Sequence, residues 1–304
     1  MLVAPLRVAV LGPGGVGGLL AALLARAGNS VVVLAGDSTA QAIAKSGLRV
    51  ESRVFGNFEV KVQTGSRLES EVDACLITVK ATQLERALER LPKESVGDAL
   101  VIPFLNGLDH VNFLRAHYGS NVVPATIRIE VLRAEPGLIR QTSPFAAAEI
   151  ATSDRVRHPV ERFAAQLRAG GLDVKLREDE TAMLWDKLAL LGPLALLTTH
   201  ERGNVGVIRA RRRDDAIALI SEVAAVAKAE GASPDPAGTV RMLDAAPESF
   251  ETSMQRDQAA GRPIELDAIG GAVLRHAAAA GVPVPVTTRL VEELREREQA
   301  RSEH

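Results

Sequence analysis

The stretch "RVAVLGPGGVGGLLAALLARAG", residues 7–28, decides the fold of this 304-residue chain. A short apolar run reaches Gly12, and a leucine- and alanine-rich helical pattern over residues 14–28 follows it. A second apolar run, "SVVVLA", occupies residues 30–35. The order strand, glycine-rich turn, helix and strand predicts the first βαβ unit of a parallel sheet.

The glycines between this strand and helix predict a dinucleotide site. Gly12, Gly14 and Gly17 have the G-x-G-x-x-G spacing, and Gly15 lies within the same loop. Gly12 permits a tight turn, Gly14 lets the backbone approach a pyrophosphate, and Gly17 allows close packing of helix on strand. The helix N-terminus adds N–H donors and a positive dipole. The alternative is a glycine-rich turn that binds nothing.

An acid near the end of the second strand bears on which dinucleotide binds. Asp37 comes twenty residues after Gly17. A carboxylate at that place commonly binds a ribose 2′-hydroxyl and favours NAD. Alternatively, Asp37 or Ser38 caps the next helix, and both interpretations stay open on the sequence alone.

The remaining pattern predicts an α/β domain over residues 1–177 and an all-helical domain over residues 178–304. Strand and helix signals alternate up to "DVKLRE" (173–178), and strand signals then cease. "GLRVES" and "NFEVKV" are expected to pair. Three further runs, "NVVPATIRIEVL", "GLIRQT" and "FAAAEIA", are expected as antiparallel additions at the far side of the parallel sheet. Helices are predicted around residues 38–46 and 81–91 and in "HPVERFAAQLRAGG", and five more after residue 178.

Composition limits the classes of function. The formal net charge is −2, with 46% hydrophobic and 24% charged residues, which is typical of a globular protein and argues against a nucleic-acid partner. No signal-like segment or uninterrupted apolar run of eighteen residues is found, so we expect a cytoplasmic protein with no membrane partner. The single cysteine, Cys75, lies in an apolar run and is expected to be a buried structural thiol. The histidine spacings predict no metal site.

A lysine in an apolar helix is the most informative residue of the second half. Lys187, in "MLWDKLALLGPL" (183–194), has leucine or methionine three and four residues away on both sides. Burying an unpaired ammonium costs several kcal/mol. Lys187 therefore either extends to water or has a chemical task. Pro193 is expected to kink or interrupt this helix.

Four other polar residues attract attention by their places. Lys80 and Asn106 each follow a predicted strand, at the edge where ligands of doubly wound sheets bind. A solvated lysine and an Asn-Gly turn are the alternatives. Ser253 and Glu265 lie near the starts of predicted helices, and neither is distinctive alone.

Taken together, these residues resemble the 2-dehydropantoate 2-reductase (ketopantoate reductase) family over nearly the whole chain. The resemblance rests on the glycine motif, "TVKATQ" around Lys80, "LNG" around Asn106, "LWDKL" around Lys187, "TSM" followed by "IELDAIGG", and "AGVPVPVTTRL". It implies a Rossmann-type domain followed by a helical domain, the two-domain plan of 6-phosphogluconate dehydrogenase.

The resemblance also implies an activity: reduction of an α-keto acid by NADPH to the 2-hydroxy acid, in pantothenate biosynthesis. The cofactor would lie on the first domain and the substrate in the cleft between domains. Lys187 would be the general acid, and Glu265 would orient cofactor and lysine. Lys80 and Asn106 would lie on the nucleotide side, Asn106 and Lys187 would also contact substrate, and Ser253 would help to hold it.

The chain departs from the family pattern at the substrate side and at the nucleotide side. Leu191 and Ala195 stand where the family commonly has asparagines that contact substrate, which predicts a more apolar pocket and a bulkier keto acid. Thr198, Thr199 or His200 are candidates to replace them. Gly36 stands where NADPH-selective members usually have an arginine, so NADPH is the first expectation and NADH the alternative.

Two other classes of function remain open. One is a related dehydrogenase or imine reductase that uses the same Lys187 on another substrate. The other is a dinucleotide-binding sensor without turnover, which would explain the missing asparagines but not the presence of both Lys187 and Glu265. The apolar helices of the second domain would permit a homodimer.

Overall fold

The computed structural model describes residues 4–302, and by their contacts these fall into two units. Unit 1 holds the chain up to Leu105 together with His110–Glu180. Unit 2 holds Asn106–Asp109 together with the chain from Thr181 onward. The four residues Asn106–Asp109 therefore pack with the later half of the sequence, although the segments on both sides of them belong to unit 1. The division expected from the sequence, 1–177 and 178–304, stays a prediction for the functional domains.

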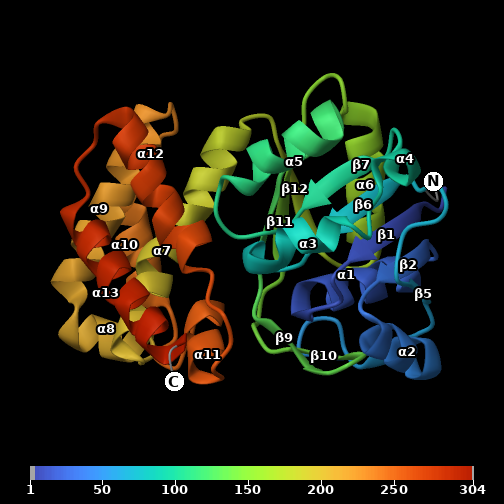
Figure 1. The fold of residues 1–304 in the computed structure, drawn as a ribbon, viewed down its shortest axis with the longest axis horizontal. Coiled ribbons are helices and arrows are strands. Elements are labelled where there is room, and N and C mark those ends of the chain that lie inside the picture. Colours follow the sequence, from blue (N-terminus) through green and yellow to red (C-terminus); the bar gives the residue numbers. More distant parts are fainter. Residues whose placement is uncertain (1–3, 303–304) are drawn as a thin grey trace. The chain divides into compact units, whose positions relative to one another are not determined.

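Unit 1 is built on the parallel sheet that the opening stretch predicts (Figure 1). The sheet has five parallel strands in the order β5-β2-β1-β6-β7, and helix α1 (Gly15–Arg26) connects β1 to β2. The central strands are buried almost throughout, as expected where both faces of a parallel sheet are covered. Its strands are β1 (Arg7–Leu11), β2 (Ser30–Leu34), β5 (Gln63–Gly65), β6 (Ala74–Ile77) and β7 (Leu100–Pro103).

The later strands of unit 1 form two other sheets, so the expectation that they extend the parallel sheet is wrong. A four-stranded sheet has the order β4-β3-β10-β9, and a three-stranded sheet the order β12-β11-β8. The expected pairing of β3 with β4 is confirmed. The strands are β3 (Leu48–Ser52), β4 (Phe58–Val60), β8 (Ala125–Arg128), β9 (Val131–Glu135), β10 (Leu138–Gln141), β11 (Ala147–Ala151) and β12 (Asp173–Arg177).

Packing against helix α1 accounts for the position of β10 outside the parallel sheet. Ile139 of β10 is fully buried, and a Cβ at Gly18 of α1 would collide with its side chain. The apolar side of β10 is thus buried on α1, while its backbone pairs in parallel with β3. An alternating pattern identifies a strand but not the surface that will cover it.

The helices of unit 1 follow the predicted positions with one break. The helix expected over residues 81–91 divides into a 3₁₀ turn and the short helix α3 (Leu84–Leu88). Cys75 is fully buried in β6, as expected, and this burial raises the pKa of its thiol to about 12. The other helices are α2 (Asp37–Ser46), α4 (Lys93–Val96), α5 (His110–Tyr118) and α6 (Arg157–Ala169), with 3₁₀ turns at Ala81–Gln83 and Gly119–Asn121.

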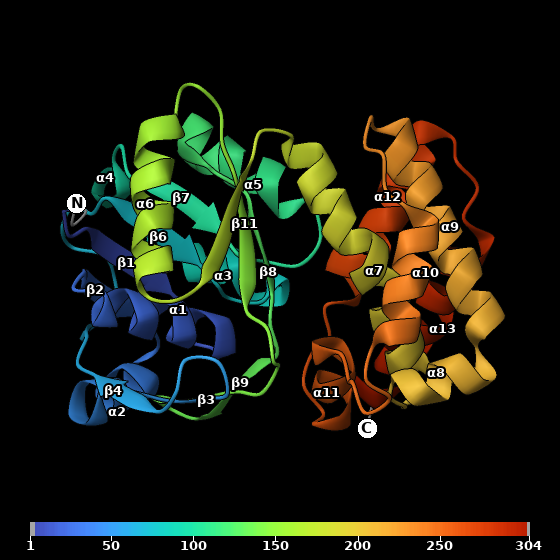
Figure 2. The ribbon, with the colours of Figure 1, turned by 180° about the vertical axis from the view of Figure 1, so that it is seen from behind.

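Unit 2 is helical, and α9 packs against α8, α10, α12 and α13 (Figure 2). The sequence did not predict α10, whose stretch contains proline and glycine; Pro236 is tolerated because it lies in the first turn. A π-helical turn, Asp267–Gly271, precedes α12. The helices are α7 (Glu180–Glu201), α8 (Val205–Arg211), α9 (Arg213–Ala229), α10 (Pro236–Ala245), α11 (Ser253–Ala259), α12 (Ala272–Ala280) and α13 (Pro285–Ser302).

Helix α7 is the core helix of unit 2. It continues through Pro193, so the expected interruption does not occur. Trp185 and Ala195 are fully buried in the core formed by these helices. Within the described residues, α7 is the one helix long and apolar enough to cross a membrane by length and composition, but 61% of that apolar window is buried inside the protein. Its apolar character is accounted for by the core.

Replacing Phe163 tests the core of unit 1. This α6 side chain is fully buried against the parallel sheet's core, so Phe163→Ala should lower the free energy of unfolding by about 3–5 kcal/mol. Phe113 of α5 is 44% exposed, and Phe113→Ala is the matched control, expected within about 0.5 kcal/mol of the unmodified protein. Urea unfolding of both variants measures the difference. Equal losses would contradict the assignment of Phe163 to the core.

Candidate functional site

The glycine loop at the end of β1 has the geometry of a dinucleotide turn. Gly12 has a φ of +91°, a conformation that side-chain-bearing residues rarely adopt. Its N–H donates to the carbonyl oxygen of Leu34 at 3.1 Å, which ties the loop to the end of β2. A Cβ at Gly12 would lie 2.5 Å from Cγ1 of Val79. The loop is therefore confined between the ends of β2 and β6.

The other loop glycines divide into one open position and two crowded ones. A Cβ at Gly14 would have no atom within 4 Å, so this backbone faces open space. A Cβ at Gly15 would lie 2.7 Å from the carbonyl oxygen of Val131, and one at Gly17 would collide with Thr78 and with the carbonyl of Gly12. Helix α1 has no side-chain cap and no acid in its first turn. Its free N-terminal amides and the open backbone at Gly14 suit a pyrophosphate.

Thr78 holds this loop, and the sequence analysis missed it. Its Oγ1 donates to the carbonyl oxygens of Leu11 at 2.9 Å and Gly12 at 2.8 Å. The hydroxyl thus joins the carboxyl end of β6 to the glycine turn after β1. The available signal was a hydroxyl residue at the end of a buried apolar run, immediately before Val79 and Lys80.

Lys80 and Asp37 both lie at the carboxyl edge of the parallel sheet. Lys80 is half-buried and follows Thr78 and Val79 at the end of β6. Asp37 is exposed and is the first residue of α2, whose N-cap is Gly36. Because no side chain caps this helix, the interpretation of Asp37 or Ser38 as its cap is wrong. The roles of Lys80 and Asp37 in binding a nucleotide stay predictions.

Arg90 is a basic residue at the same edge that the sequence did not single out. Its Nη1 donates to the carbonyl oxygens of Ala35 at 3.1 Å and Ser66 at 2.7 Å. A Cβ at Gly36 would lie 4.0 Å from its Nη2. The fold therefore brings a guanidinium to the end of β2, where the local sequence has none.

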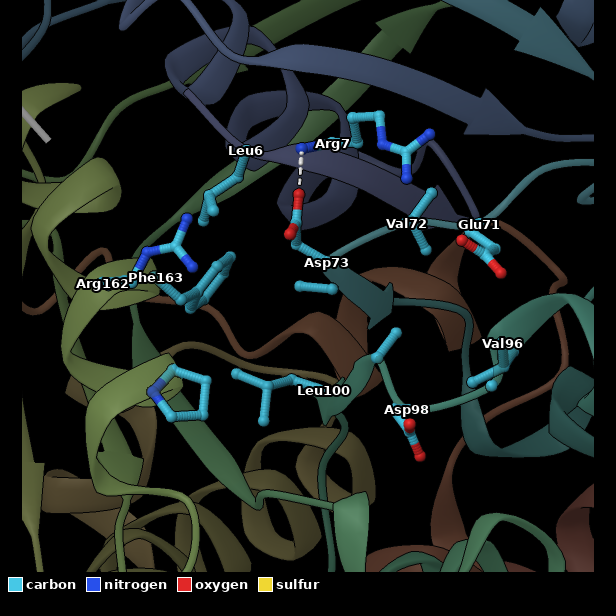
Figure 3. Close-up of a pocket in the computed structure, with 14 residues that line it drawn as sticks. Leu6, Arg7, Glu71, Val72, Asp73, Val96, Asp98, Leu100, Arg162 and Phe163 are labelled. Carbon is cyan, nitrogen blue, oxygen red and sulfur yellow. Dashed lines mark hydrogen bonds between the residues drawn. The ribbon is translucent and has the colours of Figure 1, made fainter. Parts of the chain in front are cut away.

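A cavity of about 380 Å³ lies at the opposite edge of the sheet (Figure 3). Leu6 and Arg7 line it at the start of β1, and Asp73 and Leu100 at the starts of β6 and β7. The backbone N–H of Arg7 donates to Oδ2 of Asp73 at 2.7 Å, so one of the acids lining it is already engaged. Ligands of doubly wound sheets bind at the carboxyl ends, so this cavity is not the nucleotide site.

In unit 2, the structure brings together two of the predicted site residues that are far apart in the sequence. Nδ2 of Asn106 donates to Oε2 of Glu265 at 3.0 Å. Glu265 is only 6% exposed, so its carboxylate is largely shielded from water. The neighbouring Gly107 has a φ of +86°, and a Cβ there would collide with the carbonyl of Ala268 in the π-helical turn. Gly107 of the Asn-Gly pair thus lies directly against that turn, a rare helix type that occurs frequently at functional sites.

Lys187 lies on α7 among the residues of the same core. It is half-buried, while Met183 is fully buried and Leu188 is 2% exposed. Leu188 shares one hydrophobic cluster with Ile264 and Leu266, the residues on either side of Glu265. Lys187, Asn106 and Glu265 therefore all belong to unit 2.

The structure places Ser253 next to a buried hydroxyl pair. Ser253 is exposed at the start of α11, and its N-cap Thr252 accepts a hydrogen bond from the N–H of Gln255. The hydroxyls of Thr252 and Thr198 lie 2.8 Å apart, and Thr198 also donates to the carbonyl of Leu194 at 2.7 Å. Helix α7 is thereby linked to the segment that carries Ser253.

Of the candidates to replace the missing asparagines, Thr198 and His200 already have partners within the protein, and the roles of all three residues stay predictions. Thr198 and Thr199 are fully buried, and Thr198 spends its hydroxyl on Thr252 and the backbone. His200 contacts Glu201 at 3.0 Å and Glu293 at 2.5 Å, so both ring nitrogens already have partners. With Leu191 half-buried and Ala195 fully buried, this stretch of α7 stays apolar.

A partly buried chain of hydrogen-bonded side chains connects the Asn106 segment to α7. Nε1 of Trp185 donates to Glu230 at 3.0 Å, and Glu230 also bonds Nδ1 of His276. Nε2 of His276 lies 3.0 Å from Oδ1 of Asp109. The other carboxylate oxygen of Asp109, Oδ2, accepts from Arg275. Trp185 precedes Lys187 by two residues and Asp109 follows Asn106 by three, so the chain fixes both segments within unit 2.

The charges of His276, Asp109 and Glu230 stabilise one another. Both ring nitrogens of His276 face carboxylates, so only the imidazolium can donate to both. The hydrogen bond with Asp109, followed by that with Glu230, raises the pKa of His276 despite partial burial. The hydrogen bond from His276, with help from Arg275, lowers the pKa of Asp109 to about 2. No pattern in the sequence indicates this cluster, because its members come from four separate segments.

Comparison with known proteins identifies the family. The family model described as "Ketopantoate reductase PanE/ApbA" matches residues 8–154, and "Ketopantoate reductase PanE/ApbA C terminal" matches residues 179–298. The chain belongs to the ketopantoate reductase family, and it is an oxidoreductase of that family. The sequence-based recognition and the predicted fold class are confirmed.

Individual members of the ketopantoate reductase family are similar over nearly their full length. A 2-dehydropantoate 2-reductase of Mycobacterium tuberculosis is 32% identical over 304 residues, covering 93% of this chain and 95% of that protein. The crystal structure of a ketopantoate reductase family protein from Ralstonia eutropha JMP134 is 28% identical, with a TM-score of 0.88 over 97% of this chain and 99% of that one. A D-mandelate dehydrogenase solved with NADH and anilino(oxo)acetate shares the fold, with a TM-score of 0.89 at 22% identity.

Two glycine substitutions distinguish an effect on nucleotide binding from an effect on the stability of the fold. Gly14→Ala adds a methyl group to open space, so it should weaken NADP⁺ and NADPH binding about tenfold while changing stability by less than about 1 kcal/mol. Gly17→Ala adds the same group against Thr78 and Gly12, so it should destabilise the protein by about 1–3 kcal/mol. NADPH fluorescence titration and urea unfolding measure the two effects. A Gly14→Ala variant that binds normally would count against the assigned pyrophosphate position.

The His276 cluster predicts a pH-dependent stability. Because the folded-state pKa of His276 is raised above its unfolded value near 6.5, its stabilisation is complete below that value and is lost as pH rises through the folded pKa. His276→Gln should therefore cost most near pH 6 and progressively less at alkaline pH. Urea unfolding across this range measures it, with the exposed His158→Gln as control. A cost that does not change with pH would refute a charged His276.

Proposed function

We propose that this protein reduces the ketone of an α-keto acid to the corresponding 2-hydroxy acid, with a nicotinamide dinucleotide bound at the Gly12–Gly17 loop. The observation that carries the proposal is the bond between Asn106 and the buried carboxylate of Glu265, in the unit that also holds Lys187. Three residues that are widely separated in the sequence, and that all match the family's functional motifs, thus share one unit. A sensor without turnover would have no evident use for this arrangement.

The chemistry requires one hydride and one proton. The reduced nicotinamide, when bound, supplies the hydride to the carbonyl carbon. The carbonyl π bond breaks, its electron pair moves to oxygen, and the ammonium of Lys187 stabilises this developing alkoxide. Transfer of a proton from Nζ then gives the alcohol and leaves a neutral lysine that solvent reprotonates. Apolar neighbours such as Met183 and Leu188 lower the local polarity around the half-buried Lys187, which strengthens this electrostatic contribution.

Glu265 and Asn106 are assigned to orientation. The Asn106 amide holds one carboxylate oxygen of Glu265 at a fixed position, and the π-helical turn next to it fixes the Asn-Gly segment. In our proposal the carboxylate supports the positive charge of Lys187, and Asn106 and Lys80 contact the nucleotide. Ser253, exposed at the start of α11, would bind the substrate carboxylate or hydroxyl.

The substrate class is an α-keto acid, with ketopantoate, and so a role in pantothenate biosynthesis, as the first candidate. The apolar stretch of α7 favours a second candidate. Leu191 and Ala195 cannot form a side-chain hydrogen bond with the hydroxyl group of a substrate such as ketopantoate, so a bulkier apolar keto acid fits this helix better. NADPH is proposed as the hydride source and NADH as the alternative. A cytoplasmic location and a homodimer stay predictions.

Replacing Lys187 tests the proposal. Lys187→Ala should lower kcat for keto-acid reduction about 10²- to 10⁴-fold, because it removes the general acid, while NADPH binding stays unchanged. The measurement is NADPH oxidation with ketopantoate and a panel of larger α-keto acids, beside fluorescence titration of NADPH. The exposed Lys228 of α9 gives the matched control, Lys228→Ala.

Each result of this experiment has a definite meaning. Turnover restricted to the larger keto acids would select the second candidate substrate. Undiminished turnover in Lys187→Ala would exclude Lys187 as the acid. A protein that binds NADPH tightly but turns over no member of the panel would refute the reductase and favour the sensor.

A further inference from the structure

The carboxyl end of β2 determines which dinucleotide a fold of this kind accepts. At this place the adenosine ribose lies, and a local acid reads its 2′-hydroxyl or a nearby arginine accommodates a 2′-phosphate. The local residues here are Ala35, Gly36 and Asp37, which include no base. The local residues alone therefore offer no basic group to a 2′-phosphate.

The fold supplies a base from another segment. Arg90 follows α3, more than fifty residues after β2 in the sequence, yet Nη1 of its guanidinium donates to the carbonyl of Ala35 at 3.1 Å. A second bond from Nη1 reaches the carbonyl of Ser66 at 2.7 Å. The backbone of Arg90 is also fixed, since its carbonyl accepts from the N–H of Leu68 at 2.8 Å. Both the main chain and the head group of this half-buried arginine are thus held in place.

One edge of the guanidinium is left for a ligand. Both hydrogen bonds of the guanidinium use Nη1, and within residues 4–302 neither Nε nor Nη2 of Arg90 donates to another protein group. Nη2 lies 4.0 Å from the place where a side chain on Gly36 would begin, so the absent side chain leaves this nitrogen accessible. A guanidinium with free N–H groups and a fixed position suits the oxygens of a phosphate.

The start of α2 adds donors at the same place. Gly36 is the N-cap of this ten-residue helix, and no side chain bonds its first amides. The exposed carboxylate of Asp37 opposes an anion there, but it is one solvated charge, and it faces both a guanidinium held by two hydrogen bonds and the N-terminus of a helix.

We propose that Arg90 binds the 2′-phosphate of the dinucleotide and makes this protein selective for NADPH over NADH. Arg90 then takes the part that an arginine at the position of Gly36 would otherwise play. The inference rests on the proposed dinucleotide site at the Gly12–Gly17 loop, but it does not depend on the identity of the keto acid.

Binding titrations test it without turnover. Isothermal titration calorimetry of the full chain with NADP⁺ and NAD⁺ should show tighter binding of NADP⁺. Arg90→Ala should weaken NADP⁺ about 10- to 100-fold, the effect of losing charge-assisted hydrogen bonds, and leave NAD⁺ within about threefold. Arg86 lies one turn earlier, is exposed, and gives the control Arg86→Ala, for which neither affinity should change.

A conservative variant and a fragment of the cofactor guard against a folding defect. Arg90→Lys retains a charge but not the paired N–H groups, so its loss of NADP⁺ affinity should be smaller than that of Arg90→Ala. Adenosine 2′,5′-bisphosphate should compete with NADP⁺ in the unmodified protein and should lose this ability in Arg90→Ala.

Equal weakening of NADP⁺ and NAD⁺ by Arg90→Ala would show that Arg90 only supports the loops at Ala35 and Ser66, and would overturn the proposal. Preference of the unmodified protein for NAD⁺ would overturn it as well. Failure of the proposed reductase activity gives a different result, namely no turnover with normal and selective nucleotide binding.

Discussion

The close approach of α1 to the ends of β1 and β6 is the constraint on which unit 1 depends. Gly17 has no room for a methyl group, because Thr78 and the carbonyl of Gly12 already fill the space. The Thr78 hydroxyl bonds both Leu11 and Gly12, so the same contact that excludes a side chain also fixes the loop. The helix N-terminus is held at the sheet edge as a result, and its unbonded amides are donors of the kind that bind phosphate groups.

Unit 2 holds charged groups against an apolar helical core. Glu265 is nearly inaccessible and accepts from Asn106, while Trp185, Glu230, His276 and Asp109 form a continuous polar chain. Buried polar groups are tolerated only when their bonds are satisfied, and a satisfied network fixes one arrangement. The cluster therefore positions the Asn106 segment and the helix of Lys187 within one unit.

In our proposal, the residues that select the ligands differ from those that carry out the chemistry. Lys187, the proposed acid, lies on α7, and the stretch of α7 that follows it is apolar at Leu191 and Ala195, while the end of β2 has no local base. An apolar surface discriminates substrates by shape and desolvation, and only weakly among similar apolar groups. In our proposal, the apolar stretch of α7 therefore affects which keto acid is accepted, while Lys187 remains the acid.

The sequence by itself determined the parallel sheet, the glycine loop, the helical second half and the family, because strand and helix periods and glycine spacing are local properties. It also selected Lys80, Asn106, Lys187, Ser253 and Glu265 by their motifs, and it expected Cys75 to be buried. The sequence-based predictions that were wrong concern local structure or pairing that depends on which segments pack together. An alternating strand does not specify its neighbour, so β8 to β11 were assigned to the wrong sheet; α10 was hidden by proline and glycine; and Pro193 did not interrupt α7.

Only the tertiary structure decided which polar groups meet. The bond from Asn106 to Glu265 spans 159 residues, that from Arg90 to Ala35 spans 55, and that from Thr78 to Gly12 spans 66. None of these side chains has a local pattern that announces its partner. The physical reason is that a hydrogen bond is directional and short, so it forms only after the packing of apolar faces has brought the two segments to the same place.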